Sequence, residues 1–337
     1  MPLSDRIDAW THIFPPAYFA RLQTMASATG PLRRWLELKS LYDLDHRFRL
    51  MDGFAGYRQL LTPSMPPIED LADGTLAVDL MRLMNDGLAE LVVLHPHRFP
   101  AFAAALSLHD IDAALAEIGR ADRMGAAGFQ LCTHVRGVPL DHPRFAPVFD
   151  EIARRKLAIW LHPVRGPTPD YPTETKSRYE IWWCFGWPYD SSVAMSRLVF
   201  SGLFDRHPNL KIITHHMGAM IPYFAGRIEQ GWGLEMGSRT PPADADLLPG
   251  PLQRPAEEYF RMFFADTALS GAVGATRCGL DYFGADQVVF ASDFPFDAEG
   301  GSYLVRETIK ALDALELTKA VRHQIDVGNI SELIHRN

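Results

Sequence analysis

The stretch GFQLCTHVRGVPLDHPRFAPVFDEIARRKLAIWLHP, residues 128–163, contains one complete strand–helix–strand unit. It begins with a short apolar run at 128–133, continues into an amphipathic segment at 142–156, and ends with a second apolar run at 158–163. Apolar residues spaced three and four apart predict a helix, whereas short runs rich in β-branched or aromatic residues predict strands. This order predicts two parallel strands joined by a crossover helix.

The same alternation extends along the chain. A second helix is predicted at 110–125, where Asp110 provides a cap and Gly125 a stop. Repetition of the unit predicts an α/β protein with a closed (β/α)8 barrel, a TIM barrel, rather than an open doubly wound sheet. The eight predicted strands are at 7–12, 57–64, 91–96, 128–133, 158–163, 211–216, 263–268 and 288–295.

Two longer segments interrupt the alternation. Residues 13–56 separate the first two predicted strands with too much chain for one helix, and residues 164–190 are rich in proline and aromatic residues. Both follow strand ends, so we expect them on the carboxyl-terminal face of the barrel, where active-site loops lie. We interpret 13–56 as an inserted cap and 1–337 as a single domain.

Composition restricts the function. The chain is 47% hydrophobic with 20 Phe, which is enough apolar material for an extensive core. A net charge of -8 without a Lys/Arg run argues against a nucleic-acid or anionic-membrane partner and favours a small molecule. The start MPLSDRIDAW lacks the pattern of a secretory signal, and no apolar run reaches membrane-spanning length, so we expect a cytoplasmic protein.

Several predicted strands end on polar residues. His12, His162 and Asp293 lie at the ends of three different strands, which converge on one mouth in a barrel. Two imidazoles and a carboxylate suit zinc or another borderline divalent metal. His216 follows the sixth strand and is a candidate general acid or base. Because strand side chains alternate, we expect only one of His215 and His216 to face the mouth.

Three segments resemble the amidohydrolase-2 branch of the amidohydrolase superfamily: AIWLHP at 158–163, LVFSGLFDRHPNLKIITHHMGAMIPYFAGRIEQGW at 198–232, and VVFASDFPF at 288–296. Further likeness lies at 41–52 and 85–108, so the resemblance covers nearly the whole chain. The chain looks most like the metal-dependent decarboxylases grouped with aminocarboxymuconate semialdehyde decarboxylase and γ-resorcylate decarboxylase.

This resemblance implies a barrel with one catalytic divalent ion, usually zinc or manganese, and commonly a homodimer. By residue it implies that His12, His162 and Asp293 are metal ligands and that His216 is catalytic, with Asp293 sharing that role. Trp10 is a departure, because family members carry His or Glu there. Tryptophan offers only an N–H donor and cannot bind a cation through it. We expect Trp10 to form a packing wall or a stacking surface for a planar substrate.

The resemblance also implies roles for two arginines. Arg47, in HRFRLMD, is similar to the family arginine that binds a substrate carboxylate, and Arg227, in AGRIEQG, is similar to one contributed across a dimer interface. A planar guanidinium binds a carboxylate through two hydrogen bonds, so either residue suits an acidic substrate.

These features predict a metal-dependent, non-oxidative decarboxylase, a carboxy-lyase of small aromatic or unsaturated carboxylic acids. His216 or Asp293 would handle the proton that replaces CO2, and aromatic residues of 164–190 would close over the substrate. One alternative is a metal-dependent hydrolase, lactonase or hydratase on the same barrel. Another is a barrel that has lost its metal and binds an acid without turning it over.

Overall fold

The computed structural model describes residues 5–25, 33–234, 250 and 252–335. β1 (Arg6–Ile13) and β2 (Tyr57–Pro63) form a parallel pair. Six further strands form a parallel sheet in the order β10-β9-β8-β7-β4-β3. Their bounds are β3 Ala103–Ala105, β4 Gly128–Cys132, β7 Ala158–His162, β8 Ile212–Thr214, β9 Phe264–Asp266 and β10 Val288–Val289.

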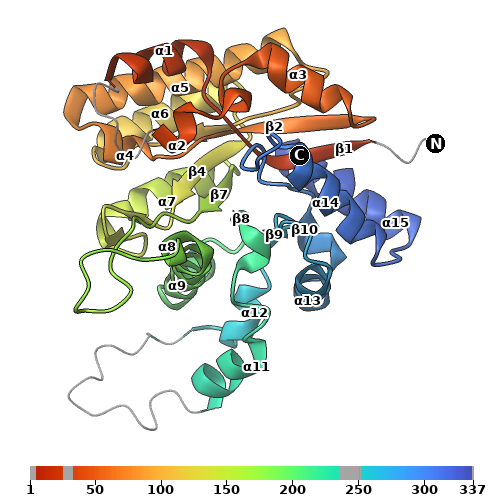
Figure 1. Cartoon of the computed structure of the whole chain (residues 1–337). Coiled ribbons are helices and arrows are strands. Elements are labelled where there is room, and N and C mark those ends of the chain that lie inside the picture. The colour runs from red at the N-terminus through yellow and green to blue at the C-terminus, as the bar shows by residue number, and fades with distance from the viewer. Residues whose placement is uncertain (1–4, 26–32, 235–249, 251, 336–337) are drawn as a thin grey trace.

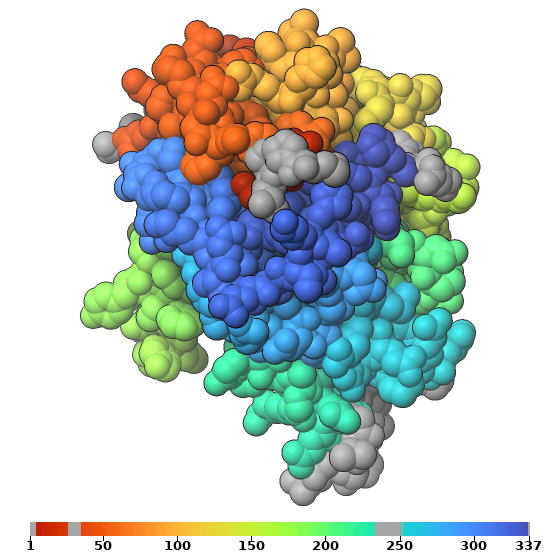
Figure 2. Space-filling model, turned by 90° about the vertical axis from the view of Figure 1, so that its right-hand side faces the viewer, coloured from red at the N-terminus to blue at the C-terminus, as the bar shows by residue number. Residues whose placement is uncertain are grey.

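Two parallel bridges join the β1–β2 pair to the six-stranded sheet. Thr11 pairs with Phe294, beyond β10, and Leu61 in β2 pairs with Phe102, beside β3. Backbone hydrogen bonds accompany both bridges. The eight strands therefore close into a ring, and the prediction of a (β/α)8 barrel is confirmed. Figure 1 shows helices arranged around these strands, and Figure 2 shows the C-terminal helices in blue packed against the N-terminal part of the chain.

The helices agree with the predicted crossovers. Helix α6 (Ile111–Arg123) begins at Asp110, whose side chain accepts a 2.9 Å hydrogen bond from the amide of Ala113, and α7 (Ala146–Arg154) follows a short 3-10 turn. Within the described ranges no helix is long and apolar enough to cross a membrane. The remaining helices are α1 Pro16–Met25, α2 Arg33–Leu36, α3 Leu44–Asp52, α4 Ile68–Leu71, α5 Gly74–Leu94, α8 Ile181–Cys184, α9 Gly186–Phe200, α10 Leu203–Arg206, α11 Ala225–Ile228, α12 Ala256–Phe260, α13 Val273–Phe283, α14 Ser302–Asp313, α15 Lys319–His323 and α16 Asn329–Ile334.

The third predicted strand, 91–96, is wrong. Its residues Leu91 to Leu94 form the last turn of α5, and the third strand of the barrel is β3. The apolar run LVVL looks like a strand in isolation, but it ends a helical pattern that buries Leu80, Met84, Leu88 and Leu91. The true strand consists of three buried alanines and lacks the β-branched residues by which strands are recognised.

Short helices and irregular stretches make up the described parts of the two predicted insertions. Residues 13–56 contain α1, α2, α3 and a 3-10 turn at Lys39–Leu41. Residues 164–190 contain an irregular stretch, then α8 and the start of α9. A two-stranded antiparallel ribbon, β5 (His134–Val135) with β6 (Val138–Pro139), follows β4.

Small residues line the barrel interior and leave room for two tryptophans. Trp10 and Trp160 are fully buried in a cluster that includes seven alanines from the strands and their ends, Ala9, Ala101, Ala103, Ala127, Ala158, Ala268 and Ala291. Trp160 donates its indole N–H to the carbonyl of Ala9 at 2.9 Å. A Cβ at Gly128 would lie 2.7 Å from the Trp160 ring, so this position requires glycine. The tryptophans fill the barrel below its carboxyl-terminal mouth.

Candidate active site

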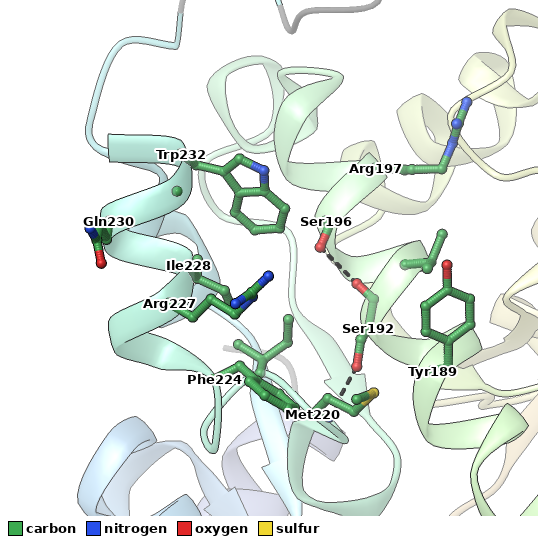
Figure 3. A pocket seen from close by; sticks show the side chains of 13 residues that line it. Tyr189, Ser192, Ser196, Arg197, Met220, Phe224, Arg227, Ile228, Gln230 and Trp232 are labelled. Atoms are coloured by element: carbon green, nitrogen blue, oxygen red, sulfur yellow. Dashed lines mark hydrogen bonds between the residues drawn. The ribbon is translucent and has the colours of Figure 1, made fainter. Parts of the chain in front are cut away.

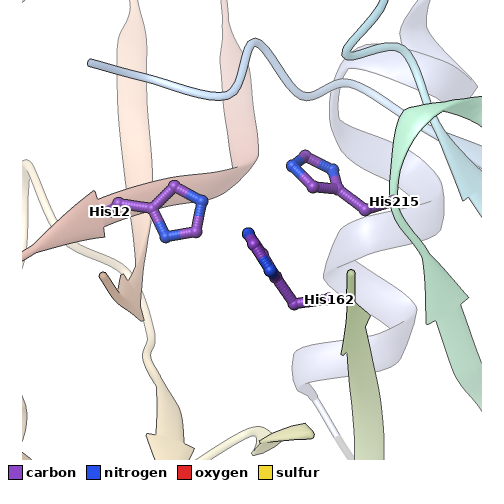
Figure 4. Close-up of side chains that lie close together, drawn as sticks. All are labelled: His12, His162 and His215. Carbon is purple, nitrogen blue, oxygen red and sulfur yellow. The ribbon is translucent and has the colours of Figure 1, made fainter. Parts of the chain in front are cut away.

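Three histidines converge at the mouth of the barrel (Figure 4). His12 is the second-to-last residue of β1, His162 is the last residue of β7, and His215 directly follows β8. One ring nitrogen from each lies within 4.8 Å of one from each of the others. All three side chains are buried, with exposed fractions of 0%, 1% and 0%. Because strand ends meet at one face of a barrel, residues more than 200 positions apart can supply one site.

Each of these imidazoles is held by its Nδ1 atom. His12 Nδ1 lies 2.8 Å from the carbonyl oxygen of Pro63, and His162 Nδ1 lies 2.6 Å from that of Pro163. His215 Nδ1 is hydrogen-bonded to the Asp266 carboxylate. These oxygens only accept, so each Nδ1 carries the hydrogen, and in the neutral ring Nε2 keeps its lone pair. His12 Nε2 and His215 Nε2 are buried and have no hydrogen-bond partner among the described residues.

Asp293 adds a carboxylate to this group. Its Oδ1 atom lies 3.3 Å from Nε2 of both His12 and His215, and its Oδ2 atom lies 3.8 Å from His216 Nε2. Three imidazoles and a carboxylate are a donor set that suits a divalent metal.

Strained backbone positions the site residues. Asp293 has a φ of 65°, and His216 and Met217 both have a φ of 55°, a conformation that is rare outside glycine. At the next position, Gly218 has a φ of 74°, and a Cβ there would lie 2.5 Å from the Phe283 ring. Such strain persists where the surrounding structure enforces it and is concentrated at functional sites.

The charges in this group are strongly coupled. Burial alone would raise the pKa of Asp293, but His12, His215 and His216 hold it well below its usual range. Burial lowers the pKa of His215, but Asp266 and Asp293 outweigh that effect and raise it to about 9. Burial and the neighbouring His12 and His215 hold the pKa of His162 well below its ordinary value, so His162 is neutral, the form that binds metals.

A cavity of about 570 Å³ opens above His216 and Asp293. Trp182, Trp183 and Trp187 enter it from α8 and α9. The Trp187 ring meets the edge of His162, with their centroids 5.6 Å apart. The other lining residues are Trp35, Leu38, Cys184, Pro188, Ala268, Leu269, Ser270, Phe296, Asp297, Ala298 and Leu304. Flat aromatic walls above a polar floor suit a planar ring that carries a charged group.

Comparison with known proteins agrees with this geometry. The family model described as Amidohydrolase matches residues 7–336. The chain belongs to the amidohydrolase family. It is 30% identical over 338 residues to a gamma-resorcylate decarboxylase of Polaromonas sp. (strain JS666), covering 95% of this chain and 97% of that protein. It is 26% identical to a 2-amino-3-carboxymuconate-6-semialdehyde decarboxylase of Dictyostelium discoideum, covering 77% of this chain and 67% of that one.

Solved structures of decarboxylases resemble this amidohydrolase over almost their full length. The crystal structure of 2,6-dihydroxybenzoate decarboxylase from Rhizobium has a TM-score of 0.76 and 26% identity, covering 98% of both chains. A dihydroxybenzoic acid decarboxylase from Polaromonas sp. JS666, with bound manganese and the inhibitor 2-nitroresorcinol, has a TM-score of 0.76 and 25% identity, covering 98% of this chain and 97% of that chain.

The predicted residues His12, His162, His216 and Asp293 all lie in this amidohydrolase site. The expectation that only one histidine of the pair faces the mouth is wrong, because both His215 and His216 approach Asp293. Strand geometry ends at Thr214, so alternation no longer separates the two rings, and they stack with centroids 3.8 Å apart. Sequence reasoning did not place His215 with the metal ligands. Side chains two residues apart on a strand point to the same side, so the buried Ile213 would have indicated that His215 points into the barrel.

Trp10 lies beneath the site. It is fully buried and stacks on His215, with ring centroids 4.1 Å apart and an angle of 20° between the planes. It therefore forms a wall that supports His215 and does not line the 570 Å³ cavity.

The two predicted arginines lie elsewhere. Arg47 is fully buried and donates from Nη1 to the carbonyl of His12 at 2.7 Å and from Nε to Gln59 at 2.6 Å. Burial lowers its pKa to about 9. Arg227, on α11, lines a separate pocket of about 860 Å³, where it faces Ser192 and Ser196 of α9 (Figure 3). A contact of either arginine with substrate stays a prediction.

Proposed function

We propose that this amidohydrolase is a metal-dependent, non-oxidative decarboxylase of small aromatic carboxylic acids. The observation that carries the proposal is the buried group of His12, His162 and His215, with Asp293 lying 3.3 Å from His12 and lining the aromatic cavity. Relatives over nearly the whole chain are named as decarboxylases of aromatic or unsaturated acids, which supports this reaction class.

His12, His162 and Asp293 would hold the metal. Their fit is supported by the anchored Nδ1 atoms, which leave the Nε2 lone pairs of both histidines facing one centre. We propose zinc as the resident ion, because imidazole nitrogen suits zinc whereas manganese favours oxygen ligands. When bound, a divalent ion supplies positive charge that stabilises the negative charge developing as the carbon–carbon bond breaks.

The side chains around the cavity perform the remaining steps. Trp182, Trp183 and Trp187 hold a planar ring and keep water from the site. The bond between the ring carbon and the carboxylate breaks, CO2 leaves, and the electron pair stays on the ring carbon. A proton then adds to that carbon. His216 lines the cavity with 20% of its side chain exposed and its Nε2 near Asp293, so we assign proton delivery to His216, which the Asp293 carboxylate orients.

We further propose that a second copy of the chain covers the pocket around Arg227. The pocket is open at the surface, and Tyr189 and Trp232 provide apolar contact area beside the guanidinium. Sedimentation analysis would show a dimer that Arg227→Ala weakens. A monomeric wild-type protein would contradict this proposal without affecting the decarboxylase assignment.

A product assay tests the function. Purified enzyme supplied with zinc or manganese is incubated with hydroxybenzoic acids, including 2,6-dihydroxybenzoate, and both CO2 and the ring product are measured. We expect one CO2 for each molecule of decarboxylated ring product. The Asp293→Ala variant should show no turnover. Ring opening or hydration without CO2 would instead identify a hydrolase or hydratase. Binding of the acids without turnover would identify a non-catalytic barrel.

A further inference from the structure

His215 has the geometry of a metal ligand. It is fully buried, and its Nε2 atom has no hydrogen-bond partner in the part of the chain that the structure describes. One of its nitrogens lies within 4.8 Å of nitrogens from His12 and His162 (Figure 4). Its contact with Asp293 Oδ1, at 3.3 Å, does not have hydrogen-bond geometry, so a ligand would satisfy this buried atom.

Two neighbours fix the His215 ring. The Asp266 carboxylate bonds to Nδ1, and its other oxygen accepts from the amides of Met217 at 3.2 Å and Ala268 at 3.0 Å. A carboxylate held in this way fixes the tautomer of a histidine and makes its other nitrogen a stronger metal ligand. The Trp10 ring stacks on the imidazole and keeps it from rotating.

Trp10 also shows why a metal ligand at His215 matters. The indole lies beside His162 and His215 but offers no lone pair to a cation. We infer that His215 is itself a protein ligand of the metal and supplies from the β8 end the donor that β1 lacks at Trp10. The ion is then held by three imidazoles and the Asp293 carboxylate. This inference rests on the metal-binding part of the proposed function.

An alternative role for His215 is only to position Asp293, without binding the metal. Its Nε2 atom lies 3.3 Å from Asp293 Oδ1, close enough to orient that carboxylate without touching a metal. His216 offers a matched control, because its ring stacks on His215 and its Nε2 atom also approaches Asp293, at 3.8 Å. His216 faces the cavity and lies outside the three-histidine group, although with His215 and Asp293 it forms a second group that could hold an ion, so its variant also tells the two groups apart. The two variants therefore separate metal binding from the orientation of Asp293.

The experiment measures zinc affinity by competition with a chromophoric chelator in wild type, His215→Ala, Asp266→Asn and His216→Ala. We expect Asp266→Asn to weaken zinc binding by about 10- to 100-fold, the usual effect of losing an outer partner. His215→Ala should lose more than that, and His216→Ala should stay within about threefold of wild type, since no ligand is removed. His215→Ala with affinity equal to that of His216→Ala would overturn the inference.

A second measurement uses wild-type protein alone and does not depend on how a variant folds. X-ray absorption at the zinc edge counts the imidazoles around the bound ion. Three imidazoles support the inference, and two overturn it while leaving the proposed function intact. A wild-type protein that binds neither zinc nor manganese contradicts the proposed function itself, so the two failures are distinguishable.

Discussion

Strand β1 carries two buried polar groups that differ in how their atoms are satisfied. Near its beginning, Asp8 is fully buried and accepts hydrogen bonds on both oxygens. Its Oδ1 accepts from the amides of Trp10 at 3.2 Å and Ser292 at 3.1 Å, and its Oδ2 accepts from the Tyr57 hydroxyl at 2.7 Å and from the Ser292 hydroxyl. Asp8 therefore ties β1 to β2 and to the chain beyond β10.

These contacts extend into a network of Asp8, Tyr57, Gln59 and Arg47. The Gln59 side-chain amide donates to the Tyr57 oxygen at 3.2 Å, and Arg47 donates to Gln59 at 2.6 Å. Arg47 also holds the carbonyl of His12, so the network supports the strand that carries the first histidine. Within this network one buried atom, Arg47 Nη2, has no hydrogen-bond partner among the described residues.

At the carboxyl end of β1, the histidine group shows the opposite arrangement to that of Asp8. His12, His162 and His215 each use Nδ1 for a protein contact, while the nitrogens that face one another lie within 4.8 Å. Burial alone does not distinguish the two groups, because all of these side chains are almost completely buried. The difference is that both oxygens of Asp8 accept hydrogen bonds from protein donors, whereas the Nε2 atoms of His12 and His215 have no hydrogen-bond partner among the described residues. We call the Asp8 network the closed group, because protein hydrogen bonds satisfy the Asp8 carboxylate, and the three histidines the open group. A closed polar group stabilises a fold, and an open one marks a binding site.

The largest effect is expected from Asp293→Ala. This substitution removes the only carboxylate that approaches the Nε2 atoms of His12 and His215 in the described structure. Turnover should fall to background and the metal content should drop, because ligand and catalytic roles are lost together. Steady-state kinetics and metal analysis of the same preparation check both effects. Unchanged turnover would show that the open group is not the catalytic centre.

His216→Ala should separate catalysis from metal binding. His216 lines the cavity and approaches Asp293 without belonging to the three-histidine group. Loss of a general acid lowers kcat by about 10²- to 10⁴-fold. The metal content should remain that of wild type. A variant with wild-type kcat would remove His216 from the mechanism.

Asp8→Ala should give the opposite pattern. Several buried donors lose their acceptor, at about 1–3 kcal/mol each, so we expect the free energy of unfolding to fall by at least about 3 kcal/mol. Folded protein should still bind about as much metal as wild type, because no open nitrogen is removed. Denaturant unfolding measures the first effect and metal analysis the second. Wild-type stability would show that the network is not structural.

Trp187→Ala should have the smallest effect. Trp187 lines the cavity and contacts the edge of His162, so its loss should raise KM about tenfold for an aromatic acid, consistent with about 0.5–1.5 kcal/mol of ring contact plus buried area. Phe185→Ala is the matched control, because Phe185 belongs to the same segment but is 72% exposed and lies outside the cavity lining. Equal KM values for both variants would place the substrate elsewhere.

The sequence predicts the open group better than the closed one. His12, His162 and Asp293 follow clear apolar runs, and a barrel brings such strand ends together whatever their separation in sequence. The network of Asp8 and Arg47 depends on hydrogen bonds among β1, β2 and α3, which no local pattern encodes. The family resemblance made Arg47 a candidate substrate ligand, and the structure adds that its Nε and Nη1 atoms donate to Gln59 and to the carbonyl of His12.

Two errors have a common physical origin. The third strand was placed at 91–96 because this run is apolar and contains Val92 and Val93, although tertiary packing makes it the end of α5. His215 was left out of the metal ligands because alternation allowed only one histidine of the pair to face the mouth, and the family resemblance gave that place to His216. In both cases a local rule was used where the tertiary structure decides the outcome.

The most direct test is the metal content per chain of wild-type protein, purified without added metal or chelator and measured by inductively coupled plasma mass spectrometry. The open nitrogens of the histidine group predict close to one divalent ion per chain, zinc in preference to manganese. Asp8→Ala should retain the ion, and Asp293→Ala should lose it. A wild-type chain that carries no metal, and takes up none when zinc or manganese is supplied, would contradict the account.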